Sequence, residues 1–302
     1  MKTPPYIIIL SGATGSGKTS LLFEVVEHLG IKSYDKHIID DLIENDPYYK
    51  SKIKELLEKR CQGKCDIEKV NIPKKYNIDK NLSHQITDTY METREKYGCK
   101  KQSCSQKLDN SIKKSIRKGE NVILEITGMS YPKWLFNKGL DMTDTIIKNK
   151  YKVIIAYSLV SFCELIKRNY NRSYQDIKRF IESNYKSKAP RMPNIREGNQ
   201  LGRIKNTIIS VIKKECINKN TVSWCGNYKL DNLLLFNNNY KMKLVYDYKN
   251  DNNDNNDKKQ LVDNIITLIN KIEKEIPKKI KKIKKIKKTK KTKKTKKLIN
   301  LQ

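Results

Sequence analysis

Short apolar runs along the chain are separated by longer stretches whose apolar residues recur every three or four positions. The short runs predict buried strands at residues 6–10, 34–39, 121–127 and 151–159, and an alternating pattern predicts another strand at 240–248. The longer stretches predict helices at residues 20–29, 132–150, 161–169, 201–218 and 260–276. Because strands and helices alternate, we predict an α/β fold in which helices cover a mainly parallel sheet.

The most informative stretch is residues 6–25, where an apolar strand leads into a glycine-rich loop and then into an apolar helix. The loop fits the pattern G-x-x-x-x-G-K-[ST], the Walker A motif, with Gly12, Ala13, Thr14, Gly15, Ser16, Gly17, Lys18 and Thr19. Glycines allow a close backbone approach that a Cβ would block, so that successive N–H groups and the helix dipole bind phosphate oxygens. We therefore predict a nucleotide-binding loop, in which Lys18 reaches the β- and γ-phosphates and Thr19 holds Mg²⁺.

Carboxylates stand at the ends of two predicted strands. Asp40 and Asp41 end the second strand, and the carboxyl ends of parallel strands surround the bound ligand. One of the pair is our candidate for the base toward an attacking hydroxyl, or for binding a water on Mg²⁺, while Asp41 alternatively caps the next helix. Glu125 interrupts the third strand, where a buried carboxylate is costly unless it is paired or bound to a metal water. We predict that Glu125 helps to bind Mg²⁺ or substrate.

Arginines follow the fourth predicted strand. Arg168 and Arg172 stand at the end of the helix that begins at residue 161, and Arg191 and Arg196 lie in a second basic loop. Arginines in this part of a P-loop protein can close over the γ-phosphate and stabilise the charge that develops during phosphoryl transfer. Their joint placement favours Arg168 and Arg196 as catalytic residues, with Arg172 and Arg191 as further candidates.

Residues 47–115 form a long polar connection between the second and third predicted strands. Helical spacing there predicts helices at about 45–59, 82–97 and 105–118, with a loop at 61–81. We predict that this connection is a helical insert at about 47–115 within one P-loop domain that spans residues 1–276, and that the insert shapes the substrate side.

Composition restricts the class of protein. The chain has 302 residues, no run of 18 apolar residues and no leader pattern at its start, so we expect a soluble, cytoplasmic protein. Seven cysteines, an odd number spread along the chain, favour reduced thiols over a disulfide framework. The pairs Cys61/Cys65 and Cys99/Cys104 offer four thiolates for zinc, but neither has the tighter C-x2-C spacing, and we favour free thiols.

The formal net charge of +31 is concentrated at the C-terminus, where residues 278–297 contain 14 lysines and no acidic residue, which leaves +17 on the body. We expect residues 277–302 to be a disordered basic tail because neighbouring lysines repel one another. Such a tail would bind nucleic acid in a salt-dependent way, bind an anionic membrane surface, or serve as a nuclear import signal, which allows a nuclear location. A solvated charge run without a partner is the alternative.

Taken in chain order, several of these motifs resemble the zeta-toxin family of P-loop kinases. The matching pieces are the loop 12–19, Ile39-Asp40-Asp41, Leu124-Glu125-Ile126-Thr127-Gly128, Tyr157-Ser158-Leu159 with Arg168, and the later arginine loop. The resemblance covers residues 5–275. It implies a three-layer α/β/α P-loop NTPase fold, similar to nucleoside and polynucleotide kinases, and phosphorylation of a sugar hydroxyl of a UDP-activated amino sugar with ATP or GTP.

The resemblance also implies roles for single residues. Lys18 and Thr19 match the phosphate and metal residues, Glu125 matches the strand acid, and Arg168 and Arg196 match the arginines that clamp the phosphate. The family pattern after the second strand is Asp-x-Asp, whereas Leu42 stands at its third position here. The base therefore stays open between Asp40 and Asp41.

From these residues we predict an ATP-dependent phosphotransferase that uses Mg²⁺ and acts on a hydroxyl acceptor, with a UDP-amino sugar as the acceptor that the resemblance implies. A nucleoside or polynucleotide 5′-hydroxyl kinase is the alternative, and the basic body suits it. A third hypothesis is a protein that binds NTP without transferring a phosphoryl group and binds nucleic acid through its basic tail.

Overall fold

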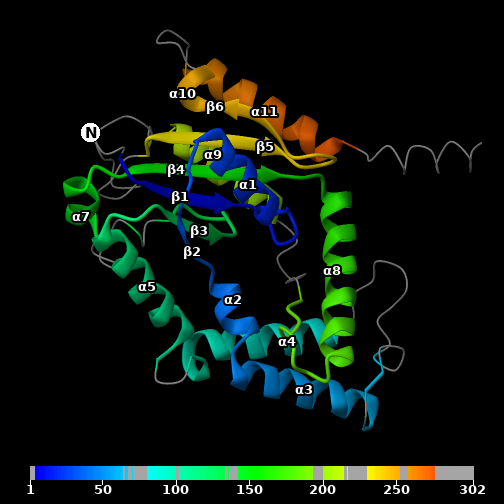
Figure 1. The fold of residues 1–302 in the computed structure, drawn as a ribbon. Coiled ribbons are helices and arrows are strands. Elements are labelled where there is room, and N and C mark those ends of the chain that lie inside the picture. The colour runs from blue at the N-terminus through cyan, green and yellow to red at the C-terminus, as the bar shows by residue number, and fades with distance from the viewer. Residues whose placement is uncertain are drawn as a thin grey trace, which may run out of the picture.

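The computed structural model describes residues 4–63, 65–66, 70, 80–99, 102–132, 135, 142–192, 200–213, 216, 230–251 and 258–275. Its centre is a six-stranded sheet in the order β2-β3-β1-β4-β5-β6 (Figure 1). The strands are β1 (Tyr6–Ser11), β2 (Asp35–His37), β3 (Val122–Ile126), β4 (Lys152–Leu159), β5 (Asn232–Asn237) and β6 (Lys243–Asp247). Only β6, at one edge, is antiparallel to its neighbour. The predicted α/β fold with a mainly parallel sheet is confirmed.

Helices cover both faces of the sheet. The helices of the described chain are α1 (Lys18–His28), α2 (Ile39–Glu44), α3 (Pro47–Cys61), α4 (Lys80–Glu92), the π-helical turn η1 (Thr93–Tyr97), α5 (Cys104–Lys118), α7 (Thr143–Lys148), α8 (Phe162–Glu182), α9 (Gln200–Lys213), α10 (Tyr248–Asp251) and α11 (Lys258–Lys274). Strand β1 is apolar on both sides: Ile7 and Ile9 pack in the core under α5, α7, α9 and α11, while Ile8 and Leu10 pack against α1. Two buried faces explain its unbroken apolar run and give three layers.

Of the helices between β2 and β3, α3 and α4 lie beyond the edge of the sheet, whereas α5 packs on it. In Figure 1, α3 and α4 cross below the sheet and the long helix α8 runs down to them. A separate hydrophobic core joins these elements, with Ile53 and Leu57 from α3, Ile86 from α4, and Ile177 and Phe180 from α8, all fully buried. This second core holds α2 and α4 opposite the carboxyl ends of the strands.

Three expectations about elements were wrong. Strand β2 ends at His37, so Asp40 and Asp41 lie in the first turn of α2, whose N-cap is Ile38. Helix α8 does not end near residue 169 but continues to Glu182, because apolar side chains keep helical spacing on the face that meets the second core. Strand β5 was not predicted at all, although Leu233, Leu234, Leu235 and Phe236 form a fully buried run.

The cysteines also differ from the expectation of reduced thiols. In the part of the chain that the structure describes, disulfides join Cys61 to Cys65 and Cys99 to Cys104, Cys216 is also disulfide-bonded, and Cys163 is a free, exposed thiol. In the described chain the two pairs do not gather into one four-thiolate group.

Several expectations lie outside the described residues: the basic tail at 278–297, Arg196, and most of the loop at 61–81. Among the helices that are described, none is both long and apolar enough to cross a membrane.

Candidate functional site

The glycine-rich loop joins β1 to α1 with a backbone that only glycine adopts readily. Gly15 and Gly17 have positive φ angles of 84° and 90°, and Gly17 is the N-cap of α1. A Cβ on Gly15 would overlap the side chain of Asn169, and one on Gly17 would overlap that of Asn238. The loop is therefore fixed both by its own conformation and by two asparagines that pack against it.

Hydrogen bonds from behind the loop hold its carbonyl groups. The carbonyl oxygen of Ser16 accepts from Asn238 Nδ2 at 2.6 Å and from Ser158 Oγ at 2.7 Å, and that of Thr14 accepts from Asn169 Nδ2 at 2.8 Å. The first N–H groups of α1 have no helical acceptor and carry the positive end of the helix dipole. With its carbonyls held at the back, the loop is an anion site of the kind that binds phosphates.

Lys18 and Glu125 face each other across the end of the sheet. Lys18 Nζ donates to the carbonyl oxygen of Gly12 at 3.1 Å, and loss of hydration lowers the pKa of Lys18 to about 8, although Glu125 opposes the shift. Burial raises the pKa of Glu125, and Lys18 opposes that shift in turn. Glu125 Oε1 is buried and has no hydrogen-bond partner in the part of the chain that the structure describes.

The donors near the loop suit a hard divalent cation. Thr19 presents an exposed hydroxyl in the first turn of α1, and the unpartnered Glu125 Oε1 supplies a carboxylate oxygen. Mg²⁺ prefers oxygen ligands and is commonly held by one or two protein oxygens together with water and substrate phosphates. Thr19 and Glu125 therefore fit Mg²⁺ brought in with a nucleotide.

Asp40 is held through both of its carboxylate oxygens. Tyr90 from α4 donates its hydroxyl to Asp40 Oδ1 at 2.6 Å, and Arg191 Nη1 lies 2.6 Å from Asp40 Oδ2. The side chains of Asp40 and Arg191 are each 18% exposed, so water screens this ion pair only in part. Asp41 forms a different ion pair, in which its Oδ1 lies 2.5 Å from Lys188 Nζ.

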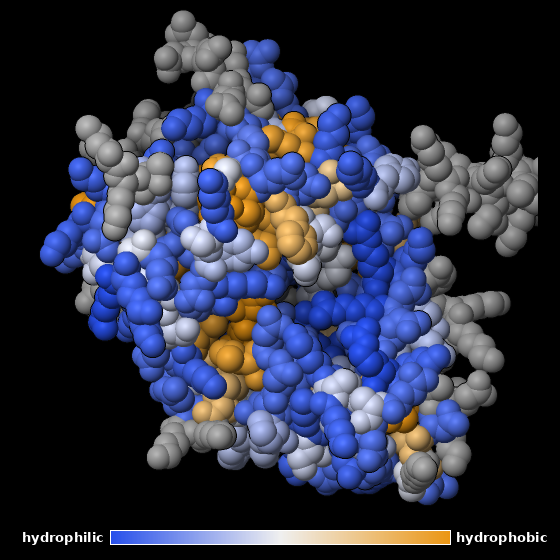
Figure 2. Space-filling model, in the orientation of Figure 1, coloured by the Kyte–Doolittle hydropathy of each residue, from blue (hydrophilic) through white to orange (hydrophobic). Residues whose placement is uncertain are grey.

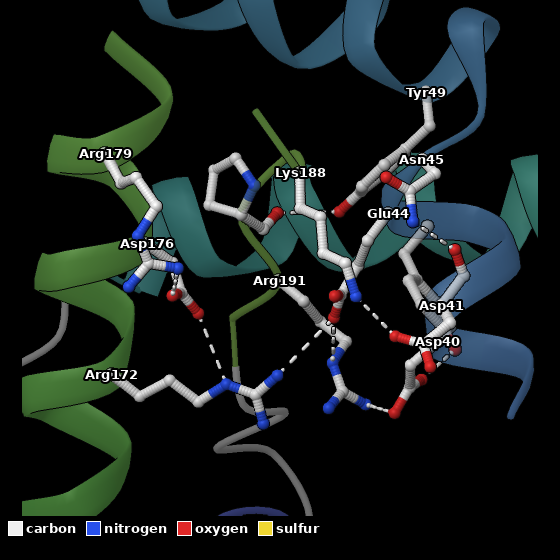
Figure 3. Close-up of polar contacts among 12 residues, drawn as sticks. Asp40, Asp41, Glu44, Asn45, Tyr49, Arg172, Asp176, Arg179, Lys188 and Arg191 are labelled. Carbon is white, nitrogen blue, oxygen red and sulfur yellow. Dashed lines mark hydrogen bonds and ion pairs between the residues drawn. The ribbon is translucent and has the colours of Figure 1, made fainter. Parts of the chain in front are cut away.

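Arg168 and Arg172 lie in the first half of α8, and Arg191 lies in the segment that follows this helix. Arg168 donates to Glu164 and to the carbonyl oxygen of Asn238, and is therefore anchored beside the loop. Figure 3 shows the guanidinium groups of Arg172 and Arg191 side by side, each joined by a dashed line to the Glu44 carboxylate.

Two adjoining cavities contain nearly all of these groups. The first, of about 270 Å³, is lined by Gly15, Gly17, Lys18, Thr19, Lys36, Ile38, Asp40, Asp41, Glu44, Glu125, Arg168, Arg172 and Arg191. The second, of about 610 Å³, lies between β3, α2, α4 and α5 and has an apolar part that includes Met91, Leu108 and Met129. Figure 2 shows apolar side chains gathered in the hollow between α5 and α2. Four charged residues line both cavities: Lys18, Asp40, Glu125 and Arg191.

The sequence analysis predicted most of the charged and loop residues that line the first cavity, but it missed several residues that line the cavity or contact its lining. Glu44 carried one available signal, because it stands four residues after Asp40 and so shares its face of α2. Tyr90, Asn169 and Asn238 carried none, since each comes from an element far away in sequence. Arg196 lies outside the described residues, so its position relative to this site stays a prediction.

No protein-family model and no curated protein matches the chain. Among solved structures it is similar to the PezAT chromosomal toxin–antitoxin system of the human pathogen Streptococcus pneumoniae, with 13% identity and a TM-score of 0.45 over 89% of this chain and 85% of that one. It is also similar to the Pnkp1/Rnl/Hen1 RNA repair complex, with 15% identity and a TM-score of 0.34 over 69% of this chain and 46% of that one. Both are distant likenesses.

Proposed function

We propose that this chain is a P-loop kinase that transfers the γ-phosphoryl group of ATP or GTP to a hydroxyl group of a second substrate. One observation carries the proposal: Lys18, Asp40, Glu125 and Arg191 line both the cavity beside the glycine-rich loop and the larger cavity next to it. A transferase needs its charged groups where donor and acceptor meet, whereas a protein that only binds nucleotide needs no second cavity there.

The donor would lie on the loop. Main-chain N–H groups and Lys18 would hold its phosphates, and Mg²⁺, when bound near Thr19 and Glu125, would neutralise charge on the β- and γ-phosphates. Arg172 and Arg191 line the same cavity and would stabilise the transferred phosphoryl group. Arg168 is held beside Ser16 and Asn238 and would contribute positive charge from there, and Arg196 remains a further candidate.

Asp40 is the base that the geometry favours. It lines both cavities, whereas Asp41 lines only the donor cavity and is paired with Lys188. An acceptor hydroxyl in the larger cavity would give its proton to Asp40 while its oxygen attacks the γ-phosphorus, and the bond from the γ-phosphorus to the bridging oxygen would break to release the nucleoside diphosphate. Tyr90 orients the carboxylate for this step through a hydrogen bond to one oxygen, and Arg191 does so through an ion pair with the other.

The acceptor cavity has room for a substrate of nucleotide size. Its volume of about 610 Å³, with Met91, Leu108 and Met129 beside Arg94 and Asp109, offers an apolar surface next to charged groups. This suits the UDP-amino sugar that the sequence resemblance implies. A nucleoside or a 5′-hydroxyl oligonucleotide is the second candidate, which the net charge of +31 favours.

Product analysis with γ-labelled ATP tests the proposal. Wild type, Lys18→Ala and Asp40→Asn are incubated with UDP-sugars, nucleosides and 5′-hydroxyl oligonucleotides, and Asp144→Asn on α7 serves as a control that removes the same charge at an exposed position. We expect one acceptor class to be labelled, with loss of labelling in Lys18→Ala and a decrease of about 10²- to 10⁴-fold in Asp40→Asn. If wild type binds ATP and labels no acceptor, the chain is not a kinase for these acceptor classes. Nucleic-acid binding through residues 278–302 is then the hypothesis to test.

A further inference from the structure

Glu44 is a carboxylate in a cavity that otherwise suits phosphate. It is the last residue of α2 and is 7% exposed, and it lines the donor cavity together with the glycine-rich loop. A negative side chain among phosphate-binding groups would repel the nucleotide. Glu44 has no role in the phosphoryl transfer proposed above, so its position in this cavity needs a separate explanation.

The two arginines of the donor cavity meet at this carboxylate. Glu44 Oε1 lies 3.5 Å from Arg172 Nη2 and 3.4 Å from Arg191 Nε. Each guanidinium has a second carboxylate partner: Arg172 Nε lies 3.2 Å from Asp176, and Arg191 Nη1 lies 2.6 Å from Asp40. Figure 3 shows both guanidinium groups directed at the Glu44 carboxylate. Two positive side chains from α8 and from the loop after it are thus gathered around one anion.

We propose that Glu44 occupies this two-arginine clamp in place of a phosphate group. When a nucleoside triphosphate binds, both arginine side chains turn from Glu44 to the phosphate, and Glu44 takes up a proton. The inference rests on the proposed function, since it needs a triphosphate in the donor cavity. The proton comes from the solvent and converts the carboxylate into a neutral carboxyl group, so the net charge that faces the phosphate becomes more positive by one.

The charges around Glu44 make this exchange feasible near neutral pH. Burial raises the pKa of Glu44 to about 7; Arg191, Arg172 and Lys188 oppose the shift, and Asp40 adds to it. Tyr49, which packs nearby, stays neutral because burial and Glu44 raise its own pKa. A phosphate that approaches Glu44 and draws the arginines away removes the opposing charges, so the pKa of Glu44 rises further.

The backbone beside Glu44 keeps the clamp in place during the exchange. Ala189 N donates to the main-chain oxygen of Glu44 at 2.8 Å, and the Tyr49 hydroxyl donates to the main-chain oxygen of Pro190 at 2.9 Å. These bonds tie the segment before Arg191 to α2 and α3 without using the Glu44 side chain. The Arg191 guanidinium can therefore turn from one anion to the other while its main chain stays fixed.

Calorimetric titration with the non-hydrolysable imido analogue of ATP tests the inference. Binding to wild type and Glu44→Gln is measured at pH 7.5 in buffers of different ionisation enthalpy, which gives the number of protons taken up. Glu182→Gln, at an exposed position of α8, is the matched control. The comparison between variants cancels the titration of the analogue itself.

We expect wild type and Glu182→Gln to take up more protons than Glu44→Gln. We also expect Glu44→Gln to bind the analogue more tightly at pH 8, on the order of tenfold, and equally at pH 6, where Glu44 is already neutral. Equal proton uptake in wild type and Glu44→Gln would overturn the inference, as would weaker binding by Glu44→Gln at every pH, which indicates a structural role.

Two further outcomes separate the inference from its premise. Wild type that fails to bind the analogue would refute the proposed function, whereas normal binding without the extra proton would refute only the role of Glu44. If Glu44→Gln does not fold, Arg172→Gln is used in its place. The Arg172 side chain is 41% exposed, so we expect this variant to fold. Leaving Glu44 with one arginine should lower both the affinity and the proton uptake at pH 7.5, and unchanged uptake would count against the inference.

Discussion

Replacement of Glu44 by Gln should change how the stability of the protein depends on pH. Glu44 has its ordinary pKa of 4.5 in the unfolded chain and a pKa of about 7 in the folded protein, because burial outweighs the nearby arginines. A carboxyl group whose pKa is raised by folding contributes stability that is fully present below the unfolded pKa and is lost as the pH rises through the folded pKa. Wild type therefore loses stability from this group between pH 4.5 and about 7, and the Gln variant does not.

The size of this loss follows from the two pKa values. The folded and unfolded pKa values of Glu44 differ by about 2.5. Since one pKa unit corresponds to about 1.36 kcal/mol, this difference amounts to roughly 3 kcal/mol in the free energy of unfolding. For a domain with a total stability of about 5–15 kcal/mol, this is a large fraction. The free energy of unfolding of Glu44→Gln, minus that of wild type, should thus rise by roughly 3 kcal/mol between pH 4.5 and pH 8 and level off above that.

Urea denaturation at intervals between pH 4.5 and pH 8 measures this difference. Taking the difference between variants removes the contributions of the other titrating groups, and Glu182→Gln reports the effect of losing one surface charge. Two stability curves that stay parallel over the whole range would refute the reasoning, because they would mean that Glu44 has the same pKa in the folded and unfolded states.

Three further predictions concern the loop, the base and the disulfides. Gly17→Ala should weaken nucleotide binding at least tenfold in a titration, because a Cβ would meet Asn238 at a φ of 90°; unchanged affinity would contradict the described loop. Tyr90→Phe removes one hydrogen bond to Asp40 and should lower kcat by about tenfold or more while leaving KM for ATP nearly unchanged; an equal change in both would place Tyr90 in binding instead. Replacement of both Cys99 and Cys104 by Ser should lower the free energy of unfolding by about 2 kcal/mol in urea denaturation without reductant, because the bridge restricts the unfolded chain; unchanged stability would contradict this.

The parts of the fold that were predicted correctly are those whose signal is local. Strand β1, the glycine-rich loop and α1 follow one another within a short stretch, and the residue types of the loop are those that its backbone conformation needs and that a phosphate-binding motif would use. The ends of α3 and α5 were found to within about two residues for the same reason, since apolar spacing and capping residues stand next to each other. Strand β5 was missed because its short run lies among asparagines, which usually indicate a loop.

The chain order of the motifs placed the nucleotide loop, the strand acid Glu125 and the acid pair at 40–41 at one end of a parallel sheet, because all parallel strands end on that side. Which acid lies at the junction of the two cavities was settled by packing. Asp40 meets Tyr90 and Arg191 because a second hydrophobic core holds α4 and the end of α8 against α2. Contacts of this kind join residues 50 and 151 positions apart, and no periodicity or spacing in the sequence carries information about such distant partners.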